Sequence, residues 1–241
     1  MCVYKTVALL IAVLAATPTA SLAADMAARP PVITAESVVP DETGAGWYLR
    51  GDIGYASNVA PSMSWQTTSY SGNRAANSGT FDFGLGYRFT ENLRSDVTLD
   101  FLTSHRVLGA LNATTTDTLN QDMTAVLVNG YYDIGKFMGI TPYIGAGIGA
   151  ARINADQLTR SVNGTTTYVF NSASNYTLAA AATTGFSFDI GHGLQADLGY
   201  KFAWFGNSTT GLESTSHLTS KVNIGNSTVH ELRFGLKYFI N

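Results

Sequence analysis

Past its N-terminal stretch, the chain alternates apolar and polar residues in eight separate segments, and no apolar run there could form a membrane-spanning helix. A period of two is typical of a β-strand with one apolar and one polar face. In the segment 47–55, Leu49 and Ile53 share one parity, and Arg50 and Asp52 share the other. Such a chain can cross a membrane only as a closed barrel, in which every backbone N–H and C=O group is paired.

Most of the segments have about the 9–11 residues that a tilted strand needs to cross a bilayer. The fourth is less regular, because Leu127 shares its parity with Asn129 and Asp133. The sixth contains an alanine run at 178–182 that suits a helix by propensity, although Thr183 and the residues after it favour a strand. The segments are 47–55, 81–89, 93–101, 126–133, 142–150, 176–189, 194–204 and 231–238.

The connections between these segments alternate in length. Short turns are expected at 90–92, 135–140 and 190–193, and long links rich in Ser, Thr, Asn and Gly at 58–78, 104–121, 153–175 and 206–228. Short periplasmic turns and long external loops are typical of outer-membrane barrels in Gram-negative bacteria. The sequence therefore predicts an all-β fold, an eight-stranded antiparallel up-and-down transmembrane β-barrel over residues 47–241, with both termini in the periplasm.

A soluble eight-stranded barrel also alternates, with its apolar face inward, so periodicity alone does not separate the two folds. Only 13% of the residues are charged, against about 25% in an ordinary soluble domain. Aromatic residues on the apolar parity also gather at the segment ends, as in the two aromatic girdles of a membrane barrel. The expected girdles are Trp47, Phe89, Tyr132, Phe188 and Tyr238 at one level, and Tyr55, Phe81, Phe101, Phe202 and Trp204 at the other.

The opposite parity carries charges of both signs, which the membrane fold would point into the barrel. An eight-stranded barrel has an interior just wide enough for side chains, and charges packed there must pair. We expect a plugged lumen rather than a general diffusion channel. The predicted network consists of Arg50, Asp52, Asp82, Arg88, Arg94, Asp96, Asp100, Asp133, Asp189, Asp197, Lys201, Glu231, Arg233 and Lys237.

The N-terminal segment has the features of a secretory signal peptide. Lys5 precedes an apolar run at 7–16, and Ser21 and Ala23 provide small residues before a cleavage site. The run is too short for a membrane-spanning helix, which needs about 20 residues. We expect residues 1–23 to be removed, together with the single cysteine, and residues 24–46 to form an extended periplasmic tail.

No catalytic residue, cofactor or metal site is expected. Ser104 and His105 could belong to a lipid-modifying hydrolase, with Glu231 as a distant orienting group, but no local motif supports this over an exposed loop pair. His and Tyr side chains can bind haem iron, so His105, His217 and Tyr70 are candidate ligands. Their spacing in the sequence does not define a haem site. The near balance of charge, −3 overall, argues against nucleic-acid binding.

Four motifs carry a family resemblance: Trp47-Tyr-Leu-Arg-Gly-Asp-Ile-Gly-Tyr55, Asn129-Gly-Tyr-Tyr-Asp133, Pro142-Tyr-Ile-Gly-Ala-Gly-Ile-Gly149 and Gly235-Leu-Lys-Tyr238. They resemble the small, porin-like outer-membrane barrels of alphaproteobacteria, a family similar in fold to the OmpA and OmpX barrels that includes surface antigens and haemin-binding proteins. The resemblance covers the strands and not the loops. Such barrels end on an aromatic residue read by the assembly machinery, whereas this chain ends in Ile240-Asn241.

The resemblance implies an exported protein of the cell outer membrane with a structural and surface-exposed role. Its partners would be outer-membrane lipid and, during biogenesis, the barrel-assembly machinery. An external ligand would bind through the four long links. Two alternatives remain: loop-mediated binding of haemin or a host surface, as in an adhesin, and a narrow porin-like channel for small solutes, which a charged lumen disfavours.

Overall fold

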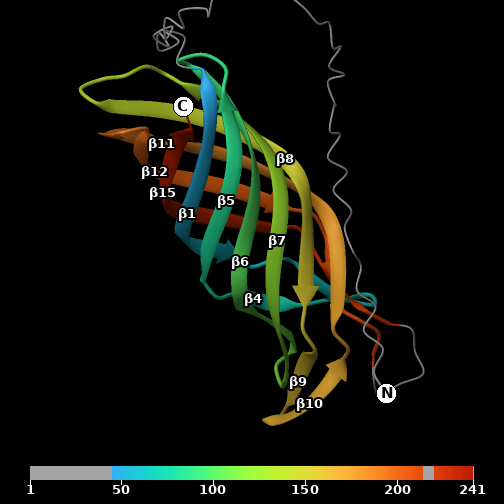
Figure 1. Cartoon of the computed structure of the whole chain (residues 1–241). Coiled ribbons are helices and arrows are strands. Elements are labelled where there is room, and N and C mark those ends of the chain that lie inside the picture. Colours follow the sequence, from blue (N-terminus) through green and yellow to red (C-terminus); the bar gives the residue numbers. More distant parts are fainter. Residues whose placement is uncertain (1–44, 214–219, 241) are drawn as a thin grey trace, which may run out of the picture. The chain divides into compact units, whose positions relative to one another are not determined.

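The computed structural model describes residues 45–213 and 220–240, which form antiparallel β-structure (Figure 1). The predicted signal peptide (1–23), most of the predicted tail (24–46) and His217 lie outside the described residues. In the described part of the chain, no helix is long and apolar enough to span a membrane.

Eight long strands pair in chain order, each antiparallel to the next. The pairing of the first strand with the last completes a ring, which confirms the predicted eight-stranded barrel. All eight predicted segments, including the irregular fourth and the alanine-rich sixth, fall in these strands, except that Phe89 follows the end of its strand. The strands are β1 (Gly46–Val59), β5 (Ser78–Arg88), β6 (Leu93–Asn112), β7 (Thr115–Asp133), β8 (Ile140–Ala155), β11 (Ala173–Gly191), β12 (Leu194–Phe205) and β15 (Ser227–Ile240).

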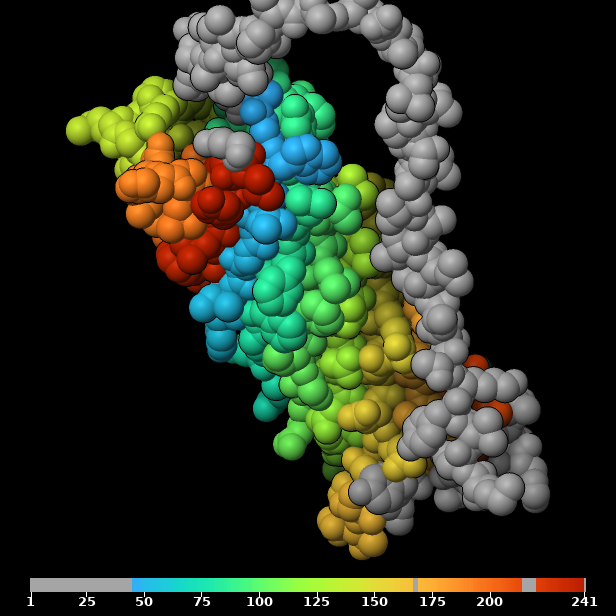
Figure 2. All heavy atoms as spheres, viewed as in Figure 1, coloured from blue at the N-terminus to red at the C-terminus, as the bar shows by residue number. Residues whose placement is uncertain are grey.

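Along these strands the polar parity is buried and the apolar parity is exposed, which is the reverse of a soluble barrel. In β1, Arg50 and Asp52 are each 5% exposed, while Leu49 and Ile53 are 49% and 66% exposed. The apolar parity therefore covers the outside, where β1, β5, β6, β7 and β8, blue to yellow in Figure 2, lie side by side as diagonal bands. This outer surface is the one that faces lipid in a transmembrane barrel.

Three short connections lie at one end of the barrel, here called the turn end. They span 89–92, 134–139 and 192–193, close to the predicted turns. The last is a two-residue hairpin in which His192 and Gly193 have φ values of 55° and 75°, as a type I′ turn requires. The chain also enters β1 and leaves β15 at this end, because Gly46 pairs with Arg88 and the Phe239 N–H donates to the Gly193 carbonyl.

The predicted long links at the other end contain more strand than loop. Strands β6 and β7 extend until only residues 113–114 separate them, and β4 and β9 pair with these extensions. A separate sheet has the order β13-β14-β2-β3. We call residues 105–121 together with the short strands of this end the cap. These strands are β2 (Met63–Trp65), β3 (Thr68–Ser69), β4 (Ser71–Ala75), β9 (Leu158–Val162), β10 (Thr165–Phe170), β13 (Ser208–Thr209) and β14 (Val222–Ile224).

An apolar core holds the cap together. Val107 and Leu119 of the extended hairpin, Leu158 of β9 and Ile224 of β14 are all buried in one cluster with residues of β2 and β10. These side chains come from all four predicted links. The high Ser, Thr and Asn content of the links is typical of loops. Apolar residues that alternate with these polar ones nevertheless give the links a buried face.

Close packing inside the barrel depends on glycine at position 86. Gly86 faces the fully buried Tyr48 across the β1–β5 pair, and a Cβ atom on Gly86 would overlap the phenol ring of Tyr48. We expect Gly86→Ala to lower the free energy of unfolding by about 1–3 kcal/mol, the usual cost of overpacking. Urea unfolding of the refolded protein in lipid vesicles measures this.

Gly130→Ala is the matched control, because a Cβ atom there meets nothing within 4 Å. Equal stability of the two variants would contradict the packing described for Tyr48.

Candidate functional site

The interior next to the turn end holds ion pairs between strands. Arg50 donates from Nε and Nη2 to the two carboxylate oxygens of Asp52, at 2.8 and 2.9 Å, and from Nη1 to Asp96 at 3.0 Å. Asp96 also accepts from the Tyr48 hydroxyl at 3.0 Å and the Asn129 amide at 2.8 Å. This one carboxylate therefore joins three strands of the barrel.

A second cluster surrounds the ammonium group of Lys201. Its Nζ lies 2.8 Å from Asp82, 3.1 Å from Asp100 and 3.1 Å from Glu231. Arg233 approaches Asp82 at 3.8 Å from another side. Three carboxylates around one lysine leave an excess of negative charge, and the nearby guanidinium partly balances it.

A third cluster is centred on Asp197, which is fully buried. The carboxylate pairs with Lys237 at 2.8 Å and accepts from the Tyr143 hydroxyl at 2.6 Å and from Ser187 at 3.0 Å. Each polar partner here lies on the inward parity of its strand. A buried carboxylate is stable only with such a complete set of partners.

Arg94 links the clusters through aromatic rings. Its Nε donates to both carboxylate oxygens of Asp133 at 3.1 Å. Its guanidinium carbon lies 4.1 Å from the ring centre of Tyr131 and 4.9 Å from that of Tyr143. Cation–π contacts of this kind stabilise a cation that has lost part of its water.

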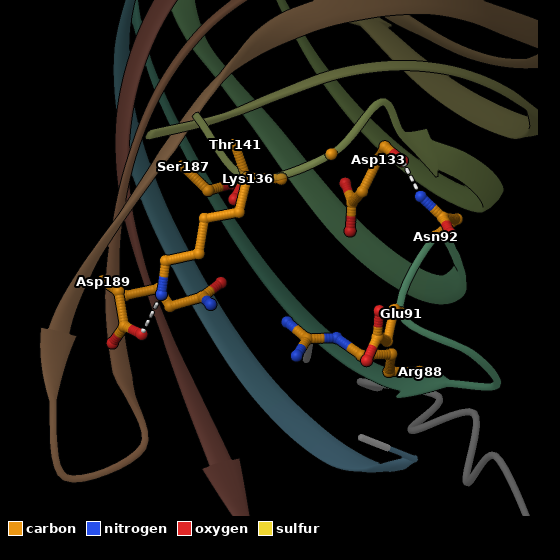
Figure 3. A pocket seen from close by; sticks show the side chains of 10 residues that line it. Arg88, Glu91, Asn92, Asp133, Lys136, Thr141, Ser187 and Asp189 are labelled. Carbon is orange, nitrogen blue, oxygen red and sulfur yellow. Dashed lines mark hydrogen bonds and ion pairs between the residues drawn. The ribbon is translucent and has the colours of Figure 1, made fainter. Parts of the chain in front are cut away.

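Two residues of the predicted network lie at the turn-end mouth and not within the paired interior (Figure 3). Arg88 is half-buried and stacks over Phe239 at 3.8 Å. Asp189 is exposed and pairs with Lys136 at 3.2 Å, which differs from the expected lumen position. Its place near the end of β11 explains this, since the strand leaves the barrel interior there. Both residues line an open hollow of about 290 Å³.

Sequence reasoning missed several inward polar and aromatic partners. Tyr48, Asn129, Tyr131 and Tyr143 share the parity of the charges, which is the signal that could have identified them. Lys136 lies in a turn and carries no such signal.

Toward the cap, the interior becomes apolar. Leu102, Met123, Leu127, Ile153 and Phe205 form a buried cluster with alanines of β7, β8, β11 and β12. This zone was not expected, and Leu127 belongs to it, which explains its irregular parity. Between the apolar cluster and Lys201 remains a hollow of about 20 Å³, roughly the space of one water molecule.

The predicted girdle aromatics lie on the parity opposite to the buried charges. Phe81 of β5 stacks on Phe101 of β6 with ring centres 4.7 Å apart, at a register position that the two residues share. The side chains of Trp47, Tyr55, Phe81, Phe89, Tyr132, Phe188, Phe202 and Tyr238 are exposed, and those of Phe101 and Trp204 are half-buried.

The cap contains a charged cluster of its own. Arg160 of β9 donates from Nε and Nη2 to the two carboxylate oxygens of Asp117, at 2.8 and 2.7 Å, and Asp117 is fully buried. The Tyr70 hydroxyl also donates to Asp117, and burial together with this hydrogen bond raises the pKa of Tyr70. The Arg160 guanidinium stacks over Trp65 at 4.6 Å and lies 5.8 Å from the ring centre of Phe170. Three of the four predicted links meet at this cluster.

Of the candidate catalytic and haem-binding residues, His105, Glu231 and Tyr70 have other contacts in the structure, and His217 lies outside the described residues. Ser104 is exposed, whereas His105 is buried with its Nε2 atom 3.2 Å from the Gln121 amide. Glu231 contacts Lys201 and Thr80, and the Tyr70 hydroxyl is bound to Asp117. Among residues 45–213 and 220–240, no three His, Cys, Asp or Glu side chains are grouped as metal ligands would be.

Comparison with known proteins gives matches over most of the chain. A family model described as "Surface antigen" matches residues 102–238. A protein of Rickettsia bellii (strain OSU 85-389) named "Putative adhesin" is 30% identical over 205 residues, covering 80% of this chain and 87% of that protein. An uncharacterized protein of Brucella abortus (strain 2308) is 28% identical over 230 residues, covering 81% and 80%.

Among solved structures, Neisserial surface protein A matches with a TM-score of 0.45 and 20% identity, covering 82% of this chain and 99% of its own. The outer membrane protein OprG from Pseudomonas aeruginosa matches with a TM-score of 0.47 and 13% identity, covering 81% and 97%.

Buried and exposed ion pairs should respond differently to loss of a carboxylate. Asp96→Ala leaves Arg50 with one carboxylate fewer. It also removes the nearer of the two acceptors of the Tyr48 hydroxyl and of the Asn129 amide. We expect it to lower the free energy of unfolding by about 3–5 kcal/mol. Asp189→Ala removes the exposed partner of Lys136 and should cost less than about 1 kcal/mol. Urea unfolding in vesicles compares them, and a small loss for Asp96→Ala would contradict the network.

Proposed function

Because the chain belongs to the surface antigen family and folds as an eight-stranded transmembrane barrel, we propose that it acts at the bacterial surface as an adhesin-like protein. The resemblance to small outer-membrane barrels is thereby confirmed. The observation that carries the proposal is the cap, a folded body with its own apolar core and ion pair. The barrel anchors this body in the outer membrane, and the cap contacts the outside.

The proposed orientation places the turn end in the periplasm. Short turns in the periplasm and long extensions outside are the general pattern of such barrels. β1 begins and β15 ends at the turn end. In this orientation both ends of the barrel lie in the periplasm, to which a cleaved signal peptide at residues 1–23 would direct the chain. The barrel-assembly machinery and outer-membrane lipid are then its partners during and after insertion.

We also propose that the lumen does not conduct. Ion pairs fill the half next to the turn end, and apolar side chains such as Leu127 and Ile153 fill the half next to the cap. An apolar constriction excludes hydrated ions, whose water it cannot replace. This arrangement disfavours the porin-like alternative and leaves structural anchoring as the role of the barrel.

A binding role outside the cell receives further support from relatives. The Rickettsia bellii protein named "Putative adhesin" shares 30% of its aligned residues with this chain. The haemin alternative loses support, because the hydroxyl of Tyr70 is engaged with Asp117 and His105 is buried. Nothing in the site favours a hydrolase, since Glu231 is held by Lys201 and not by His105.

Adhesion should depend on a folded cap. Displayed on a non-adherent Gram-negative strain, the protein should raise the number of bacteria bound per epithelial cell several-fold. Arg160→Gln leaves the buried Asp117 without its cation and should abolish most of that gain, while the barrel itself persists. Limited proteolysis confirms the opened cap, and a heat-shifted gel band confirms the intact barrel.

The matched control is Arg152→Gln, because Arg152 is exposed and, among the described residues, its side chain donates only to Ser174. It should retain full adhesion. Two results would argue against the adhesin-like role: wild-type protein that gives no more adhesion than the host strain, or an opened cap that leaves adhesion unchanged.

The filled lumen gives a separate prediction for electrical conductance. Purified protein inserted into planar bilayers should show no large, steady single-channel current, because buried apolar side chains occupy the interior next to the cap. A porin with 16 strands, which contains an aqueous channel, serves as the positive control for the recording. Steady conductance from the folded protein would show that the lumen is open.

A further inference from the structure

The cap contains a hollow of about 560 Å³ whose lining is entirely uncharged. It lies where β2 and β3, from the first link, meet β13 and β14, from the last, beside the start of β11. Its volume is within the range of about 300–1,000 Å³ that is usual for small-molecule sites. No described residue of the ion-pair clusters lines it apart from Tyr70.

Three amide groups line this hollow without a partner among the residues that the structure describes. Asn207, Asn223 and Asn226 are exposed, and within the described ranges their side chains make no hydrogen bond. Asn175, in contrast, is used structurally, since its amide donates to the Thr209 carbonyl at 2.7 Å and accepts from the Thr209 N–H at 3.2 Å. Each free amide offers donors and an acceptor side by side.

Apolar side chains lie beside these amides. Met63, Ile224 and the ring of Tyr70 all line the hollow and are buried in the cap core. A sugar ring has hydroxyl groups around its edge and C–H groups on its faces. The free amides match the hydroxyl groups of a saccharide, while the core residues, at most 7% exposed, leave a limited apolar area for its C–H groups.

The hollow is also held in a fixed shape. The Gly225 N–H donates to the Ser62 carbonyl at 2.7 Å, and Asn223 and Ile224 pair in register with Ser64 and Met63. A site that is ordered before binding loses less conformational entropy when the ligand arrives.

From this chemistry we propose that the hollow binds a neutral saccharide, such as the uncharged end of a glycan on a host surface. The proposal rests on the adhesin-like function, and it names the ligand class of the cap. An uncharged lining disfavours sialylated or sulfated sugars, because it offers their anionic groups no cationic partner.

The test uses the full-length protein purified from outer membranes in detergent. The probes are immobilised lactose, mannotriose and chitotriose, with 3′-sialyllactose as the charged counterpart. The wild type should bind at least one neutral probe, and Asn207→Ala/Asn223→Ala should weaken that binding at least tenfold. Asn120→Ala is the matched control, because Asn120 is an exposed amide of the cap that does not line this hollow. It should bind within twofold of the wild type.

Three results would overturn the proposal: no neutral probe bound, binding only to the sialylated probe, or equal binding by the double variant and the wild type. The adhesion assay run on the same variants separates the two proposals. If wild-type cells adhere while the neutral probes stay unbound, the saccharide site is wrong and the adhesin-like function stands. If the wild type neither adheres nor binds, both are wrong.

Discussion

Backbone hydrogen bonding in a medium without water determines most of this structure. Every N–H and C=O group at membrane depth must find a partner within the chain, so the strands form a ring in which β1 pairs with β15. Closure with eight strands then sets the width of the interior, which side chains alone can fill. Tyr48 against Gly86 shows how little space is left. The need for paired charges inside follows from that narrow interior, in which carboxylates such as Asp82 and Asp197 are buried.

The interior is divided along the barrel axis, and the two halves solve different problems. Near the turn end, carboxylates such as Asp96 and Asp197 join neighbouring and distant strands through several donors each. Near the cap, Leu127 and Phe205 pack in an apolar cluster, and their side chains carry no polar group that needs a hydrogen-bond partner. The first half provides directional contacts between strands, and the second provides close apolar packing.

Much of the barrel could be predicted from the sequence, because a period of two is a local property. The alternation at 47–55 identifies both the strand and its inward face. The apolar half of the lumen could not be predicted. Around Leu127 and in the alanine run, odd and even positions are both apolar, so alternation does not show which face points inward. The cap was missed for another reason: Arg160 and Asp117 are distant in sequence, and only the pairing of β9 with β7 brings them together. Asp189 was misplaced because parity does not show where a strand leaves the lumen.

The joining of three links at Asp117 also affects how an immune system would encounter this protein. In the proposed orientation, this cluster of the outward end is assembled from residues of β2, β7 and β9, which come from separate parts of the sequence. An antibody against it would recognise a discontinuous epitope, and a peptide copied from one link would lack the neighbours that give the link its shape. Sequence drift in one link would also be constrained by the residues it packs against in the others.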